Sequence, residues 1–377
     1  MLVCVACFLV VSPILVMYSM GYRFDFSKMK ITLTGGIYVR TFPTAEQIII
    51  DSDILEKPNI FSNSIFVQSL LPDDHTVLVK KNGYYDYFKT LPVLEKEVTK
   101  LENILLFKKN MAFEVIENPQ QTTEGLAKKI ISPFDSQEKY IIKNSNLYYS
   151  NSPENSNLSA IQKSNPLLKK IIAFELKNNY IVWLGLDGFL YRSDLNNLSL
   201  NPVKIILTPI KIVKAGYYKI ISDDKNTFIN NNGSLLFFND KTNELDNFYN
   251  KVKDAKISPD GKNISYFTDR ELYVSSTLTD QLPTSDKGTL LYKSPETITD
   301  CVWLNNDYVI IASANRIIIS EIDYRGNINA ISLPQIIETF TDDKVNIKNP
   351  EIFFNQQEGR LYILSNKTLL TSEKITQ

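Results

Sequence analysis

The chain has 377 residues, of which 44% are hydrophobic and 22% charged, as in a globular protein long enough for two or three domains. Its 41 basic and 42 acidic residues nearly cancel, and the lysines are scattered without a basic stripe, so nucleic-acid binding is not expected. Cys301 is the one cysteine outside the N-terminal apolar segment and His75 is the single histidine, which excludes a disulfide framework and nearly every Cys- or His-based metal centre.

The first twenty residues carry no charged side chain, and a helix of this length just crosses a hydrocarbon core of ~30 Å. Tyr18 suits an interfacial anchor, and Pro13 is tolerated in a membrane helix. We expect residues 1–20 to be a retained transmembrane anchor, because no good small-x-small cleavage site follows the apolar run. A cleaved signal peptide and a buried soluble helix are the alternatives.

The orientation of this anchor depends on the charges around it. Arg23, Lys28 and Lys30 follow the apolar segment and no basic residue precedes it, so the positive-inside rule places the main body in the cytoplasm. A basic leader missing before Met1 would reverse this orientation. We assume such a leader and expect most of the chain to be extracytoplasmic.

Residues 21–107 consist of short alternating segments separated by turn residues, without helical periodicity. Asn82-Gly83 is a strong hairpin dipeptide, and Pro43 marks a break or an edge position. The strands expected are 35–42, 45–51, 64–70, 75–81, 87–94 and 98–107. This pattern predicts a small all-β domain.

His75 stands at the head of one of these strands, beside the polar turn Pro72-Asp73-Asp74. Val77 and Val79 share its face of the strand, because side chains alternate along an extended chain. No Ser, Cys or metal-ligand cluster lies near it in sequence. We therefore interpret His75 as structural or solvated, and not as catalytic.

Four motifs in this region resemble the PEGA domain of bacterial surface proteins. They are Gly35-Gly36-Ile37-Tyr38, Pro43-Thr44-Ala45, Leu71-Pro72 and Lys81-Asn82-Gly83-Tyr84. The tetrapeptide that names the family has lost its Glu and Gly here, and Asp73-Asp74 replaces the usual Gly of the second turn. The resemblance implies a β-sandwich that serves as a binding or spacer module at the cell envelope, and it carries over no catalytic residue.

Residues 108–128 are polar, contain Pro119 and Gly125, and are expected to connect two domains. They could instead supply an outer strand to the domain that follows.

From residue 129 to 377 a unit of strand, turn, strand, turn and strand recurs. Its period is about 44 residues, which with several strands per unit is typical of a β-propeller. The first strands of the units are anchored at Ile131, Ile172, Ile221, Ile257, Trp303 and Ile352. The third strands are anchored at Tyr148, Tyr191, Phe237, Tyr273, Ile318 and Leu370. Six blades fit directly, and seven would require strands from the connector.

The segment 256–274 also resembles the WD40-like repeat of TolB-type propellers. Its Ser258-Pro259-Asp260-Gly261 closes a hairpin, with Pro and Asp-Gly at the turn positions. The resemblance supports a propeller built from radially packed sheets, which bury both faces of each sheet and leave only short edges.

No constellation of catalytic residues stands out in the sequence. Asp223-Asp224 and Asp342-Asp343 are adjacent pairs in polar turns, where neighbouring side chains diverge, and residues 240–247 lack the spacing and Gly of a calcium loop. Trp183 and Trp303 fall within strands, where core packing is expected. No catalytic, cofactor-binding or metal-binding residue is therefore assigned, and the interaction residues are unknown.

The sequence thus favours an all-β, membrane-anchored cell-envelope protein that binds and does not catalyse. The propeller would be an interaction platform for a protein or a cell-wall glycan, with the PEGA-like domain as spacer or adhesive module. A propeller enzyme acting on glycan or peptide is the alternative and would need charged residues on the inner strands, which are mostly apolar here. A cytoplasmic scaffold follows if the anchor has the opposite orientation.

Overall fold

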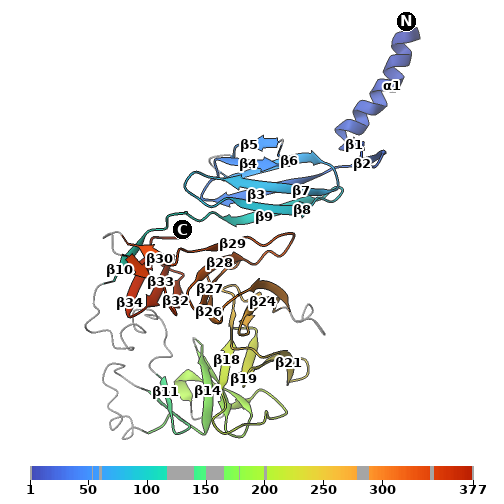
Figure 1. The fold of residues 1–377 in the computed structure, drawn as a ribbon. Coiled ribbons are helices and arrows are strands. Elements are labelled where there is room, and N and C mark those ends of the chain that lie inside the picture. Colours follow the sequence, from blue (N-terminus) through green and yellow to red (C-terminus); the bar gives the residue numbers. More distant parts are fainter. Residues whose placement is uncertain are drawn as a thin grey trace. The chain divides into compact units, whose positions relative to one another are not determined.

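The structure is a computed structural model that describes residues 2–52, 54–58, 62–116, 140–149, 165–177, 179–198, 202–277, 288–339 and 344–375. The chain divides into two compact units, and each is built from two stretches of sequence (Figure 1). Unit 1 consists of residues 1–111 and 323–331, and unit 2 consists of residues 112–322 and 332–377. The short stretch 323–331 was expected in the propeller domain, yet it belongs to unit 1.

Unit 1 begins with helix α1 (Leu2–Ser19), which contains Pro13 and has no acidic residue in its first turn and no basic residue in its last. Within the described part of the chain, no helix combines the length and the hydropathy that a membrane crossing requires. The transmembrane anchor predicted over residues 1–20 is therefore not supported.

After α1, unit 1 contains a hairpin and two sheets. The hairpin pairs β1 (Tyr22–Asp25) with β2 (Lys30–Leu33). The first sheet has the order β6 (Ser64–Leu70), β3 (Gly35–Phe42), β9 (Val98–Leu105), and the second β5 (Ile54–Glu56), β4 (Gln47–Ile50), β7 (Asp74–Lys80), β8 (Tyr87–Pro92). All six strands expected from the sequence are present, and β1, β2 and β5 were missed.

The two sheets of unit 1 share one hydrophobic core. Ile37 and Val39 from β3 are fully buried together with Val77 and Val79 from β7 and Leu91 from β8. Each pair is two residues apart on its strand, so the period-2 pattern read from the sequence is the pattern that fills the space between the sheets. The unit is a small β-sandwich.

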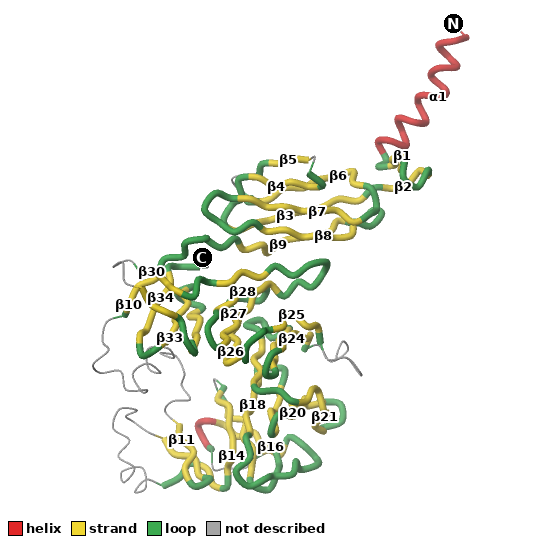
Figure 2. The backbone as a smooth tube through the Cα atoms, viewed as in Figure 1, coloured by secondary structure: helices red, strands yellow, loops and turns green. Residues whose placement is uncertain are grey.

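Unit 2 is a succession of antiparallel sheets (Figure 2), and the strands of each sheet are consecutive in the chain except in the last, which also includes β10 from the start of the unit. The first described sheet is β11 (Tyr140–Lys143), β12 (Asn146–Tyr149), β13 (Leu168–Lys169). The second is β14 (Ile171–Leu176), β15 (Tyr180–Gly185), β16 (Leu190–Asp194), β17 (Val203–Lys204), with a short 3-10 helix at Leu195–Asn197. The third is β18 (Tyr218–Ser222), β19 (Thr227–Asn231), β20 (Ser234–Asn239), β21 (Glu244–Asn250).

The later sheets repeat this plan. The fourth is β22 (Asp254–Ile257), β23 (Asn263–Phe267), β24 (Glu271–Ser276), β25 (Thr289–Lys293). The fifth is β26 (Ile298–Trp303), β27 (Tyr308–Ser313), β28 (Ile317–Glu321) and β29 (Ala330–Ser332), and the first two residues of β29 are the end of the unit 1 stretch 323–331. The sixth contains β32 (Glu351–Asn355), β33 (Arg360–Ser365) and β34 (Thr368–Ser372). A separate hairpin joins β30 (Ile336–Glu338) to β31 (Lys344–Asn346).

Neighbouring sheets of unit 2 meet through their first strands. Contacts run from β14 to β18, from β18 to β22, from β22 to β26 and from β26 to β32. Sheets of up to four antiparallel strands that pack in series through their first strands form a β-propeller. Five of the six first-strand anchors and all six third-strand anchors lie in the strands expected for them; Ile131 lies outside the described residues.

The sixth sheet contains a strand from the start of unit 2. Strand β10 (Phe113–Val115) pairs antiparallel with β34, and Phe113 is buried with 1% exposure. The segment 108–128 therefore includes an outer strand of the propeller, which was the alternative hypothesis for this connector. Within the described residues this strand completes the sixth sheet, so unit 2 shows six blades and β10 does not begin a seventh.

Candidate functional site

In unit 2, the turns that join the first strand to the second in the third, fourth and fifth sheets are hydrogen-bonded to one another. Asn226, between β18 and β19, donates from Nδ2 to the main-chain oxygen of Gly261 at 3.1 Å. The main-chain N–H of Asp260, in the same turn as Gly261, donates to Oδ1 of Asn306 in the next sheet at 3.1 Å. Three successive turns are thereby linked.

A third link reaches the last sheet. Gln356, after β32, donates from Nε2 to the main-chain oxygen of Trp303 at the end of β26, at 3.0 Å. Since all these turns follow first strands, the topology places them at one end of the propeller. We call this surface the turn face and define it as residues 223–226, 258–262, 304–307 and 355–358.

Each of these turns is also fixed internally by one polar side chain. Asp223, Asp260, Asn305 and Asn355 each accept hydrogen bonds from main-chain N–H groups two or three residues further on. Side chains of Asp and Asn stabilise tight turns in this way. The turn face is held by local bonds within each turn and by bonds between turns, so its backbone is preorganised.

The exposed tips of the turn face are polar and of mixed charge. Asp224 and Lys225 are exposed in the first turn, as are Gln356, Gln357 and Glu358 in the last. Such tips suit hydrogen-bonding partners better than apolar ones.

The second turn contains a fixed negative charge. Partial burial would raise the pKa of Asp260, but hydrogen bonds from Ser258 and from Lys262, together with the charge of Lys262, lower it below its ordinary value. Asp260 is therefore a carboxylate at neutral pH.

The first strands carry charged residues that form ion pairs from one sheet to the next. Nζ of Lys219 on β18 lies 2.7 Å from the carboxylate of Asp254 on β22, and Nζ of Lys256 on β22 lies 2.7 Å from that of Asp300 on β26. The four side chains are 20% to 38% exposed. We call these two pairs the ladder.

The inner strands, which were expected to be mostly apolar, also carry the four charged side chains of the ladder. Each carboxylate of the ladder faces an ammonium group, whereas glycoside-cleaving sites place two carboxyl groups opposite each other. Among the described residues, no group of three or more His, Cys, Asp and Glu side chains is arranged to hold a metal ion.

The residues of unit 2 that the sequence analysis considered have structural roles where the structure describes them. Asp223 accepts turn N–H groups while Asp224 is exposed, so the adjacent pair diverges as expected; Asp342-Asp343 lies outside the described residues. Trp183 and Trp303 are buried, and their indole N–H groups donate to Ser193 Oγ and to the main-chain oxygen of Lys256. Residues 240–247 include the turn between β20 and β21.

His75 in unit 1 is buried with 7% exposure, at the beginning of β7. Its Nδ1 is hydrogen-bonded to the carboxylate of Asp51, and its Nε2 lies 2.7 Å from the main-chain oxygen of Leu71. The two ring nitrogens therefore join the turn that follows β4 to the turn that precedes β7.

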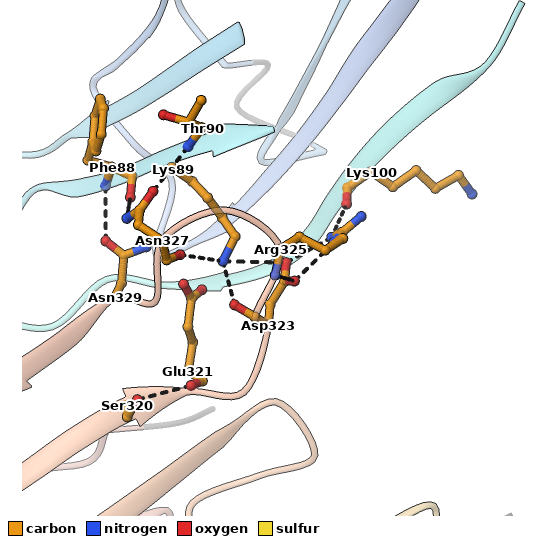
Figure 3. A network of polar contacts seen from close by, with 10 residues as sticks. All are labelled: Phe88, Lys89, Thr90, Lys100, Ser320, Glu321, Asp323, Arg325, Asn327 and Asn329. Carbon is orange, nitrogen blue, oxygen red and sulfur yellow. Dashed lines mark hydrogen bonds and ion pairs between the residues drawn. The ribbon is translucent and has the colours of Figure 1, made fainter. Parts of the chain in front are cut away.

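Unit 1 contains a second polar network that the sequence did not reveal, drawn in Figure 3. Strand β8 is the terminal strand of its sheet, and residues 323–331 lie along its free edge. Asn327 donates from Nδ2 to the oxygen of Phe88 at 2.7 Å and accepts from the N–H of Thr90 at 3.1 Å. Asn329 accepts from the N–H of Phe88 at 3.2 Å.

Lys89, between these two residues of β8, has 0% exposure. Its ammonium group donates to the main-chain oxygens of Asp323 at 2.6 Å and of Asn327 at 3.0 Å (Figure 3). Arg325 donates to the main-chain oxygen of Lys100 at 2.9 Å. We call residues 323–329 the edge clasp, because their polar groups occupy hydrogen-bonding positions that a further strand would use.

A signal for Lys89 was present in the sequence. Tyr87, Lys89 and Leu91 alternate on β8, and all three are buried. A lysine in register with core residues indicates a buried cation that needs acceptors, because an unpaired buried charge is costly. The acceptors lie more than 230 residues further along the chain and have no local signature.

No protein-family model matches the chain, and no curated protein matches it. The PEGA resemblance of residues 21–107 and the TolB-type resemblance of residues 256–274 therefore have no support from these comparisons.

Solved structures give distant likenesses. A structure described as YCF48 bound to D1 peptide has a TM-score of 0.40 and 11% identity, over 89% of this chain and 94% of that one. YCF48 from Cyanidioschyzon merolae has a TM-score of 0.42 and 12% identity, over 90% of this chain and 98% of that one. The strand order and the contacts between sheets identify the propeller.

Proposed function

We propose that this protein is a non-catalytic binding platform, and that the turn face of its propeller engages a protein or a cell-wall glycan. The observation that carries the proposal is the double fixation of the turns, within each turn and from sheet to sheet. A surface that is already rigid loses little conformational entropy when a partner binds. Its exposed Asp, Lys, Asn and Gln side chains offer both charged and neutral hydrogen-bonding groups to a partner.

The rival function is a propeller enzyme acting on glycan or peptide. Such an enzyme needs a carboxylate or another titratable group free to exchange a proton with substrate. The charged residues of the ladder are paired with opposite charges between strands, which favours a role in joining blades. A binding function without turnover is the better reading of these contacts.

The proposal also covers the role of unit 1 and the cellular location of the chain. We propose that the sandwich of unit 1 is a spacer or adhesive module, as the PEGA-like motifs suggest, and that most of the chain lies outside the cytoplasm. Labelling of lysines on intact cells with a membrane-impermeant reagent tests the location. Labelling only after lysis would exclude it.

The binding proposal is tested with the full chain on a cell-wall glycan array and a peptide array. Hits are then measured with D224A/K225A, which removes one acidic and one basic tip from the turn face. The matched control is D269A/R270A, which also removes one acidic and one basic side chain. These two residues lie in the exposed turn between β23 and β24, at the end of the fourth sheet opposite to its turn-face residues.

We expect binding of the hits to weaken at least about tenfold in D224A/K225A and less than about twofold in the control. Equal weakening in both variants, or none in either, would show that the turn face is not the binding surface. Release of cleaved probe, detected by mass spectrometry, would show an enzyme instead.

A further inference from the structure

The β1–β2 hairpin of unit 1 has its apolar side chains on the outside. Phe24 and Ile31 are cross-strand partners and are 42% and 56% exposed. Asp25 and Thr32, one position along each strand and therefore on the other face, are only 3% and 4% exposed. This is the reverse of the usual arrangement, in which a strand turns its polar face to water.

The reversal is built into the hairpin, because the inward polar groups have partners. The hydroxyl of Thr32 donates to Glu95 Oε1 at 2.5 Å. Oδ1 of Asp25 accepts from the main-chain N–H groups of Ser27 at 2.9 Å and of Lys28 at 3.0 Å. A register shift of one residue would bury Phe24 and Ile31 but would break these bonds.

The tip of the hairpin extends the apolar surface. Phe26 is 80% exposed and Met29 is 74% exposed, and the rings of Phe24 and Phe26 meet edge to face with centroids 4.9 Å apart. We call Phe24, Phe26, Met29 and Ile31 the apolar tip. Exposed clusters of this kind mark surfaces that another phase or molecule covers.

The surroundings of the apolar tip favour a lipid bilayer as that covering phase. The stretch from 21 to 33 contains Arg23, Lys28 and Lys30 and one acidic residue, the buried Asp25. Lys28 also forms an ion pair of 3.1 Å with Asp73, so its charge is partly compensated. Basic residues beside exposed aromatic and aliphatic side chains are typical of a surface that lies at the lipid headgroups.

The helix that leads into the hairpin gives a second argument. Phe8, Leu9, Val10 and Val11 point in four directions around α1, and each is at least 49% exposed. Apolar side chains on every side of a helix exceed what one groove of a protein partner covers, because such a groove contacts a single stripe. At the junction, Arg23 stacks over the ring of Tyr18 at 3.5 Å, a pair of residues suited to the interface.

We propose that the apolar tip inserts into the interfacial region of a bilayer, with the basic residues of the hairpin at the headgroups. This is a docking surface of unit 1 and is independent of the binding proposed for the turn face. The hairpin itself is the site, whatever the helix before it does.

The experiment follows the tip with a fluorescent reporter in the full chain. F26W places an indole at the most exposed apolar position, while the native Trp183 and Trp303 are buried and give a constant background. The control L207W places the same reporter at a side chain that is 67% exposed in unit 2. Both are mixed with phosphatidylcholine vesicles, with and without phosphatidylglycerol, and with vesicles of brominated lipid.

We expect the F26W emission to shift to the blue and to be quenched by brominated lipid, while L207W changes in neither way. F26S/M29S should partition into vesicles at least about tenfold more weakly than the wild type, and L207S less than about twofold. Phosphatidylglycerol should strengthen partition only a few-fold, because Lys28 is already paired.

Two outcomes would overturn the proposal. Vesicle binding without a shift of F26W would show that another part of the chain makes the contact. A blue shift that depends on protein concentration and needs no vesicles would show that a second copy of the chain covers the tip.

Discussion

The ammonium group of Lys89 donates a hydrogen bond of 2.6 Å to the main-chain oxygen of Asp323, 234 residues further along the chain. Because the side chain of Lys89 has 0% exposure and Asp323 Oδ2 lies 3.7 Å away, the cation depends on the edge clasp for acceptors. Removing its charge would leave two main-chain oxygens and a partly buried carboxylate without this donor. Removal of the charge of Lys89 should therefore also destabilise the edge clasp.

K89M keeps the aliphatic stem in the core and removes the charge. We expect it to lower the free energy of opening of β8 by about 2–4 kcal/mol, since breaking a buried charged contact has costs of this size. Amide hydrogen exchange of residues 87–92 and 323–329 measures the change. The control is K100M, because the side chain of Lys100 is 62% exposed and only its main-chain oxygen contacts the clasp. Equal protection in K89M and K100M would contradict the role of the charge.

Gly326 tests how closely the clasp approaches β8. Its φ is +65°, and an added Cβ would lie 2.0 Å from the main-chain oxygen of Thr90, so G326A should displace the clasp. Gly83 has a φ of +78° with nothing within 4 Å, so G83A has only the backbone strain, about 1 kcal/mol. Hydrogen exchange should show loss of protection at 323–329 in G326A and near-native protection there in G83A. Similar exchange at the clasp in both variants would mean that the close contact is absent.

The clasp should also loosen in acid. Burial would raise the pKa of Asp323, but hydrogen bonds from Arg325 and the charge of Lys89 lower it below its ordinary value. A carboxyl whose pKa is lower in the folded state contributes stability above the unfolded value of about 3.9, and loses it as the pH falls through the folded value. Protection factors of residues 323–329, corrected for intrinsic exchange, should fall below about pH 4. D323N should have weaker protection at neutral pH and little further change in acid; a wild-type slope in D323N would assign the effect to another group.

Much of the architecture could be predicted from the sequence because it rests on local patterns. Alternation at Val77 and Val79, the turn at Asn82-Gly83 and the recurrence of strands such as that around Tyr273 all depend on residues within a few positions of each other. The edge clasp and the ladder could not be predicted, because each joins residues from separate sheets or distant segments. A lysine and an aspartate 35 residues apart have no sequence signature until the blades are packed.

The hairpin of residues 22–33 shows a different limit. Polar and apolar residues alternate along it, but no strand was predicted at Phe24 or Ile31, which pair across the hairpin. Which face of an isolated hairpin turns inward depends on partners such as Glu95. Alternation alone gives two faces and does not say which is buried.

The ladder should couple neighbouring blades energetically. In a double-mutant cycle with K256M and D300N, we expect a coupling free energy of about 0.5–1 kcal/mol, because the two side chains are 32% and 27% exposed and solvent screens the pair. Urea denaturation of the full chain, followed by a probe in unit 2, measures the four free energies. The matched control is Lys344 with Glu338, a pair 3.0 Å apart whose side chains are 67% and 69% exposed, for which coupling near zero is expected. Coupling in the ladder should fall in 1 M salt, where the Debye length is about 3 Å. Equal coupling in both pairs would mean that the ladder is an ordinary surface contact and does not hold the blades together.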